Sequence, residues 1–123
     1  MYFCLYELHI FDKEFFYRFA TAFCKIKKPK LVVVGQDNRW SSPELTESLI
    51  KGFTDSGCNV LDLKVCGTDE MYCATSSFVA DAGFQVTASH NPINYNGMKI
   101  VKLDSQPLDD IADFQVIKRL AVS

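Results

Sequence analysis

Side chains suited to phosphate chemistry are concentrated in one short segment of this 123-residue chain. Between positions 87 and 99 lie hydroxyls, an imidazole, carboxamides and an ammonium group: Thr87, Ser89, His90, Asn91, Asn94, Asn96 and Lys99. Asn91-Pro92 and Asn96-Gly97 are strong turn signals. Backbone amides in a turn, together with a lysine, form an electropositive nest for phosphate, and a serine hydroxyl there can accept a phosphoryl group. The segment is therefore a candidate phosphoryl-transfer loop.

Residue types alone leave other interpretations of this segment open. By composition, Ser-His-Asn-Pro is more often a plain polar connection between two strands. A serine hydrolase is disfavoured because there is no Gly-x-Ser-x-Gly elbow, and because His90 is a sequence neighbour poorly placed to reach the Ser89 hydroxyl. A P-loop is excluded because Gly-x-x-x-x-Gly-Lys-Ser/Thr does not occur.

The elements that would position the loop alternate between helices and strands. Apolar runs predict strands over residues 31–34, 60–65, 84–86 and 98–103. Periodic apolar positions predict helices over 12–28, 41–56, 68–79 and 108–120. This order predicts an α/β fold of three α/β/α layers, with a mixed, mostly parallel sheet of about four strands. The third strand runs into the Ser89 loop, which places the loop beyond the carboxyl end of a strand, where ligands bind in such sheets.

Particular residues are expected to begin and end these helices. Asp12 is the expected N-cap of the first helix, and Pro29 stops that helix. Ser41 is expected to cap the second helix, which Gly57 ends in a left-handed conformation. We expect Gly83 to end the third helix, which carries Met71, Thr75, Phe78 and Val79.

Three segments resemble, in order, those of one enzyme family. Residues 87–92, Thr-Ala-Ser-His-Asn-Pro, followed by Tyr-Asn-Gly-Met-Lys at 95–99, resemble the active-site serine loop of the α-D-phosphohexomutases, particularly the bacterial phosphomannomutases. Residues 35–42 look like the family's Gly-x-Asp-x-Arg-x-Ser stretch, and residues 67–72 are similar to its Gly-Thr-x-x-x-Tyr/Phe helix start. The similarity covers roughly residues 11–110 of what we expect to be a single domain over 1–123.

The resemblance implies a role for each residue of the loop. Ser89 would hold the phosphoryl group, and its phosphate would supply one oxygen ligand to Mg²⁺. His90 would transfer a proton or contact phosphate, and Lys99 would stabilise charge on the transferring phosphate. Four residues would support the site: Thr87, Asn91, Asp37 and Arg39. For Asp37 and Arg39, a surface ion pair or hydrogen bonds at a helix entry remain open alternatives.

The family's enzymes have four domains around one cleft, and this chain resembles only the first. Nothing in it matches the Asp-Gly-Asp-Gly-Asp-Arg magnesium motif, and one serine oxygen cannot by itself hold Mg²⁺, which prefers six oxygen ligands. The family usually opens with Tyr/Phe-Asp-Ile-Arg-Gly, whereas residues 6–11 here read Tyr-Glu-Leu-His-Ile-Phe. Either that segment has degenerated or it is unrelated to the domain.

The implied function is that of an isomerase of carbohydrate metabolism, a phosphomannomutase/phosphoglucomutase that interconverts hexose 1- and 6-phosphates. It would use Mg²⁺ and a hexose 1,6-bisphosphate activator, and would work only if a complementary chain supplied the missing domains. We expect the chain alone to be inactive and to self-associate through an exposed apolar patch. The alternative is a truncated, inactive remnant or a phosphosugar-binding module.

Composition excludes several other classes of protein. The net charge of −2 favours neither nucleic acid nor an anionic membrane as a partner. No apolar stretch approaches the ~20 residues that cross a bilayer. Five cysteines without a C-x-x-C pair fit neither a disulfide framework nor a zinc site. We therefore expect a cytoplasmic protein.

Overall fold

The computed structural model describes residues 2–7, 13–87, 95–102 and 119. The helices and strands in these residues are, in chain order, β1 (Tyr2–Glu7), α1 (Lys13–Lys27), β2 (Leu31–Gln36), α2 (Ser42–Asp55), β3 (Asn59–Val65), α3 (Thr68–Ser77), β4 (Ala82–Val86) and β5 (Tyr95–Lys102). The expected N-cap Asp12 lies outside the described residues. So does the helix expected over 108–120, except for Arg119.

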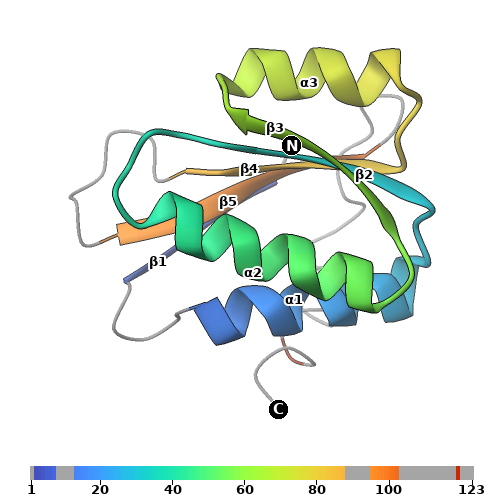
Figure 1. Ribbon diagram of the computed structural model, residues 1–123, viewed down its shortest axis with the longest axis horizontal. Helices are drawn as coiled ribbons and strands as arrows, with labels where there is room; N and C mark the ends of the chain where they lie inside the picture. Colours follow the sequence, from blue (N-terminus) through green and yellow to red (C-terminus); the bar gives the residue numbers. More distant parts are fainter. Residues whose placement is uncertain (1, 8–12, 88–94, 103–118, 120–123) are drawn as a thin grey trace.

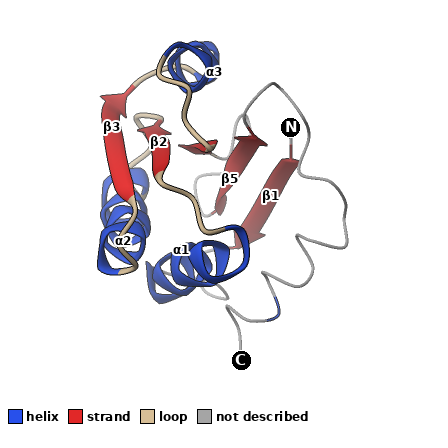
Figure 2. Cartoon of the chain, turned by 90° about the vertical axis from the view of Figure 1, so that its right-hand side faces the viewer, coloured by secondary structure: helices blue, strands red, loops and turns tan. Residues whose placement is uncertain are grey.

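The strands form one mixed sheet between two layers of helices. Their order is β1-β5-β4-β2-β3. β2 is parallel to β3 and β4, whereas β5 is antiparallel to both β4 and β1. Four of the five described strands therefore point the same way. α1 and α2 cover one face of the sheet and α3 covers the other (Figures 1 and 2). The three-layer α/β/α fold with a mostly parallel sheet is confirmed.

Strand β1 was not predicted, and it brings the sheet to five strands instead of about four. It pairs with β5 along its whole length, from Tyr2 opposite Ile100 to Glu7 opposite Tyr95. Tyr6 and Glu7, the first two residues of the atypical segment, thus lie in this edge strand. Its apolar residues show no clear two-residue alternation, so only pairing with a distant strand identifies it as a strand.

The larger core lies between the sheet and the α1–α2 layer and is rich in phenylalanine. Phe23 contacts Phe84 edge to face, with ring centroids 5.1 Å apart, and Phe53 lies 4.9 Å from the same ring. The apolar face predicted for α1 is confirmed, since four of its phenylalanines are buried: Phe15, Phe16, Phe19 and Phe23. A smaller core under α3 contains Val33, Met71, Ala80 and Val101.

The ends of α2 agree only partly with the sequence. Gly57 follows the C-cap residue Ser56 with a φ of +86°, as expected for a left-handed helix end. Ser41 stands at the N-cap position, but its side chain makes no capping hydrogen bond. The position of the expected cap is therefore correct, but its hydrogen bond is absent; the Ser41 hydroxyl instead accepts a hydrogen bond from Asn96.

Helix α3 ends earlier than its sequence pattern suggests. It stops at Ser77, and Val79 adopts a left-handed conformation with φ of 51°. The amides of Val79 and Ala80 then donate to the carbonyls of Ser76 and Thr75, which is the Schellman pattern. The prediction that the helix includes Phe78 and Val79 is therefore wrong, and their side chains are 59% and 68% exposed.

Gly83 was expected to end this helix, but it lies inside β4. A β-carbon there would collide with the Thr75 hydroxyl and the Met71 sulfur of α3. The glycine allows the helix to pack closely on the sheet. None of the described helices is long and apolar enough to span a bilayer.

Candidate active site

The candidate site lies at the edge of the sheet where the parallel strands end. Backbone hydrogen bonds continue just past these ends. The Asp37 amide donates to the Val86 carbonyl over 3.0 Å, and the Cys66 amide donates to the Gln36 carbonyl over 2.9 Å. The segments that leave β2, β3 and β4 are therefore held side by side at this edge, where ligands bind in sheets of this kind.

The base of the candidate loop is closed by a hydrogen bond. Thr87, the last described residue before the loop, is 6% exposed, and its amide donates to the Gly97 carbonyl over 3.0 Å. Both ends of the segment are thus fixed at the same place. Residues 88–94 lie outside the described part of the chain, so the structure does not place Ser89, His90 or Asn91.

Asn96 connects the base of the loop to the start of α2. Its side-chain Nδ2 donates to the hydroxyls of Ser41 over 2.8 Å and Ser42 over 3.1 Å. Its Oδ1 accepts from the Gly97 amide over 2.8 Å, and the residue is 1% exposed. Sequence reasoning treated Asn96 as a turn residue, because partners 54 and 55 positions away leave no local signal.

Asp37 organises the turn between β2 and α2. Its Oδ1 accepts hydrogen bonds from the Arg39 amide over 3.0 Å and from the Ser42 hydroxyl over 2.5 Å. The Arg39 Nε lies 3.8 Å from the other carboxylate oxygen, and the Asp37 and Arg39 side chains are 23% and 11% exposed. The structure therefore contains the hydrogen bonds at the helix entry that the sequence left as an alternative. The Asp37–Arg39 ion pair is mostly buried.

Lys99 lies on β5 directly opposite Gln85 of β4. Because side chains alternate along a strand, Lys99, Gln85 and Thr87 share the face of the sheet that α3 covers. Lys99 is partly buried there. The lysine is thus two positions from the closed base of the loop and on the same face as Thr87.

Gln85 is a buried support that sequence reasoning missed. It is 1% exposed, and its Nε2 donates to the Cys66 carbonyl over 2.8 Å. The Cys66 thiol donates back to Gln85 Oε1 over 3.6 Å. Gly35 leaves room for this contact, since a β-carbon there would overlap both partners. A glutamine between Phe84 and Val86, in a fully buried strand, is the signal that could have indicated it.

Comparison with known proteins identifies the family. The model of the phosphoglucomutase/phosphomannomutase α/β/α domain I matches residues 6–121. The chain belongs to this family. It is 42% identical over 110 residues to a phosphomannomutase of Klebsiella pneumoniae, a match that spans 89% of this chain and 70% of that protein. A phosphomannomutase of Escherichia coli is also 42% identical over 110 residues, which are 24% of its length.

Solved structures agree with this assignment of the phosphohexomutase domain. A phosphoglucomutase/phosphomannomutase family protein of Burkholderia thailandensis superposes with a TM-score of 0.74 at 28% identity, over 89% of this chain and 25% of that one. A putative phosphomannomutase of Thermus thermophilus shares the fold with a TM-score of 0.84 at 24% identity, over 97% and 28% of the two chains. The chain thus spans about a quarter of most of these relatives.

The described part of this phosphohexomutase domain does not provide a metal cage. Members of the family are generally Mg²⁺-dependent isomerases of carbohydrate metabolism. Within residues 2–7, 13–87, 95–102 and 119, no three His, Cys, Asp or Glu side chains are grouped to hold a metal ion. Asp37, whose backbone amide donates to the Val86 carbonyl beside the loop base, already accepts hydrogen bonds from Arg39 and Ser42.

Proposed function

We propose that this chain is the phosphoserine-carrying domain of a phosphohexomutase, with Ser89 as the phosphoryl carrier. One observation carries the proposal. In a chain of this family, the segment that contains Ser89 leaves and rejoins the sheet at a single hydrogen-bonded base, Thr87 to Gly97, which Asn96 fastens to α2. Phosphoryl transfer depends mainly on positioning and charge stabilisation, and a fixed base provides the positioning.

The proposed reaction exchanges one P–O bond for another in each half. A hexose hydroxyl oxygen attacks phosphorylated Ser89, the P–Oγ bond breaks, and a hexose 1,6-bisphosphate forms. The other phosphate of that intermediate then returns to Ser89 Oγ, which leaves the isomeric monophosphate. In this scheme His90 transfers the proton of the attacking hydroxyl, Lys99 stabilises the charge on the phosphate, and Asn91 supports the loop. Free hexose 1,6-bisphosphate acts as the activator by phosphorylating Ser89.

We propose that the Ser89 phosphate would supply one oxygen ligand to Mg²⁺, which would neutralise charge on the transferring group when bound. Among the described residues, no three His, Cys, Asp or Glu side chains are grouped to complete such a site. The remaining protein ligands would have to come from polypeptide other than the residues described here.

We therefore propose that the chain needs a complementary chain, and is inactive without one. The match to only 24% of the Escherichia coli phosphomannomutase supports this incompleteness. The same partial match is also consistent with the alternative, a truncated, inactive remnant or a phosphosugar-binding module. The cytoplasmic location likewise stays a prediction from the sequence.

A complementation assay tests the proposed function. The purified chain is assayed with glucose 1-phosphate and mannose 1-phosphate, Mg²⁺ and the bisphosphate activator. It is assayed alone, and also mixed with an Escherichia coli phosphomannomutase lacking its matching N-terminal quarter. We expect turnover only in the mixture, and loss of that turnover in Ser89→Ala. Ser76→Ala, an exposed serine of α3, is the matched control and should retain full turnover.

Two other results would contradict parts of the proposal. Turnover by the chain alone that disappears in Ser89→Ala would mean that it assembles a complete site without a partner. No turnover in the mixture, while the intact Escherichia coli enzyme is active in the same buffer, would favour the inactive remnant or the phosphosugar-binding module.

A further inference from the structure

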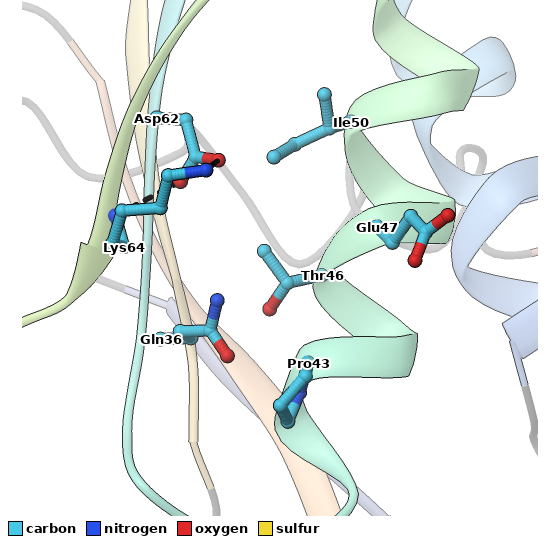
Figure 3. A pocket seen from close by; sticks show the side chains of 7 residues that line it. All are labelled: Gln36, Pro43, Thr46, Glu47, Ile50, Asp62 and Lys64. Carbon is cyan, nitrogen blue, oxygen red and sulfur yellow. Dashed lines mark hydrogen bonds and ion pairs between the residues drawn. The ribbon is translucent and has the colours of Figure 1, made fainter.

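A pocket of about 340 Å³ lies between α2 and the edge strand β3. Its volume is at the lower end of the range of about 300–1,000 Å³ typical of small-molecule sites. One wall carries Gln36, Asp62 and Lys64 from the sheet, and the other carries residues of α2 (Figure 3). None of these residues was assigned to phosphoryl chemistry, so the inference is independent of the proposed function.

Two buried polar atoms face this pocket without a protein partner. Gln36 is 9% exposed and Thr46 is 2% exposed. Gln36 Oε1 and Thr46 Oγ1 have no hydrogen bond within the described part of the chain. Figure 3 shows the amide and the hydroxyl directed from opposite walls into the space between strand and helix. Both atoms are covered from bulk solvent, so only a group that enters this space can satisfy them.

Gln36 occupies a position on β2 where an apolar side chain would be expected, yet its amide oxygen is buried without a hydrogen bond. It continues the face of β2 that carries Val32 and Val34, both fully buried against the helices. An aliphatic residue there would extend the core without leaving an unmatched acceptor. A glutamine is favoured at such a position when its amide oxygen receives a hydrogen bond.

A β-bulge places charged groups at the rim of the pocket. The pairing of β2 with β3 shifts between Val34, opposite Asp62, and Gly35, opposite Lys64, so that Leu63 is the additional residue. Lys64 adopts a left-handed φ of 62°, and its amide donates to Asp62 Oδ1 over 2.9 Å. Its Nζ lies 3.0 Å from Asp62 Oδ2. The bulge thus presents a preformed ion pair beside the unsatisfied amide.

The lining defines the chemistry of a suitable ligand. Glu47 and Asp62 against Lys64 leave one net negative charge, which disfavours a phosphorylated or carboxylated molecule. Gln36 Oε1 requires a donor, and Thr46 Oγ1 can donate or accept, a combination that one hydroxyl group satisfies. Pro43 and Ile50 offer apolar surface for the C–H face of a ring.

We propose that this α2–β3 pocket binds a small neutral polyol, with one ligand hydroxyl bridging Gln36 Oε1 and Thr46 Oγ1. Two sources share this chemistry, a free polyol or sugar and the sugar part of a hexose phosphate. The net negative lining favours the free, uncharged molecule.

Titrations of the ¹⁵N-labelled full chain followed by NMR test the proposal with three probes: myo-inositol, glucose and glucose 1-phosphate. We expect saturable shifts with a neutral probe at the Gln36 side-chain amide and the Thr46 and Lys64 backbone amides. Glucose 1-phosphate should bind there more weakly than glucose. Thr46→Val keeps the shape of the side chain but removes the hydroxyl, and should weaken binding about fivefold or more. Gln36→Met provides an independent variant.

Thr54→Val is the matched control, because Thr54 is an exposed threonine of the same helix. It should bind the probes as the parent chain does. Absence of saturable shifts with all three probes would leave only water in the pocket and overturn the proposal. So would unchanged affinity in both Thr46→Val and Gln36→Met. Tighter binding of glucose 1-phosphate than of glucose in the same pocket would overturn the choice of a neutral ligand.

Discussion

At the scale of single residues, Asn96 makes the contacts on which the candidate site depends. It is nearly fully buried and forms three side-chain hydrogen bonds, two to hydroxyls of the α2 entry and one to its neighbour's amide. Removal of one partner from such a buried network destabilises the fold strongly, because the remaining polar groups stay buried without a hydrogen bond. The loop base and the helix entry are thus coupled through one carboxamide.

Asn96→Ala is expected to lower the free energy of unfolding by about 3 kcal/mol, since it leaves the Ser41 and Ser42 hydroxyls and the Gly97 amide with fewer partners. Urea denaturation followed by circular dichroism measures the change. Asn59→Ala, at an exposed position of β3, is the matched control and should change stability by less than about 0.5 kcal/mol. Equal stability of the two variants would contradict the bridging role.

The cysteines should differ widely in reactivity. Burial raises the pKa of the Cys58 thiol to about 12, and burial also raises the pKa of the neighbouring Cys24 thiol. Because the thiolate is the reactive form, both should resist alkylation at pH 8, whereas exposed Cys73 should react quickly. Peptide mass mapping after a short iodoacetamide pulse, with and without urea, measures this order. Rapid labelling of Cys58 in the folded chain would contradict it.

At the scale of helices and strands, a glycine determines how closely α1 and α2 pack together. Gly52 of α2 faces α1, and a β-carbon there would lie 2.5 Å from the Tyr17 carbonyl oxygen and 2.7 Å from Ala20 Cβ. The two helices are therefore packed at a distance that only glycine permits at this position. Their separation in turn fixes the phenylalanine core beneath them.

Gly52→Ala is expected to destabilise the fold by about 1–3 kcal/mol through overpacking, although alanine is the better helix former by about 1 kcal/mol. Thermal and urea unfolding measure the net effect. Gly67→Ala is the matched control, because a β-carbon at that helix start meets only the Glu70 side chain, 3.5 Å away. A Gly52→Ala variant more stable than the parent would show that helix propensity outweighs the close contact.

Val79→Gly should have the opposite effect and stabilise the fold by about 0.5–1 kcal/mol. Val79 closes α3 in a left-handed conformation that is unfavourable for a β-branched residue, and its exposed side chain contributes little burial. Ser76→Gly, inside the same helix, is the control and should destabilise the fold by about 0.5 kcal/mol. Differential scanning calorimetry distinguishes the two, and a lower melting temperature for Val79→Gly would contradict the argument.

At the scale of the whole molecule, the described surface leaves several large apolar side chains in water. They are 59–68% exposed, and they lie where the strands end and beyond the end of α3: Trp40, Val65, Phe78 and Val79. Exposed apolar groups of this kind commonly mark contact surfaces. The proposed complementary chain, or a second copy of this chain, would bury these exposed apolar side chains on binding.

The isolated chain is expected to self-associate as its concentration rises, since a net charge of −2 gives little electrostatic repulsion. Sedimentation velocity over a hundredfold range of concentration measures the association. Trp40→Ser and Phe78→Ser test the two regions separately, and at least one should reduce the association. Strictly monomeric behaviour at the highest concentration would contradict the prediction.

The sequence by itself determined the class of fold and the family. Short β-branched runs and periodic phenylalanines are local signals, so β2, β4, α1 and α2 could be predicted from neighbouring residues alone. The position of Ser89 beyond the carboxyl end of β4 stays a prediction, because residues 88–94 lie outside the described part of the chain. The family motifs lie in continuous stretches and need no tertiary structure to be recognised.

The tertiary structure decided what depends on partners far apart in the chain. Strand β1 exists through its pairing with β5. Ser41 stands at the predicted N-cap position, but its hydroxyl bonds to Asn96, 55 positions away, and makes no capping hydrogen bond. The unsatisfied Gln36 and Thr46 became visible only when α2 lay against β3. Local propensities are weak compared with burial and long-range hydrogen bonds, so those contacts determine where each polar side chain ends up.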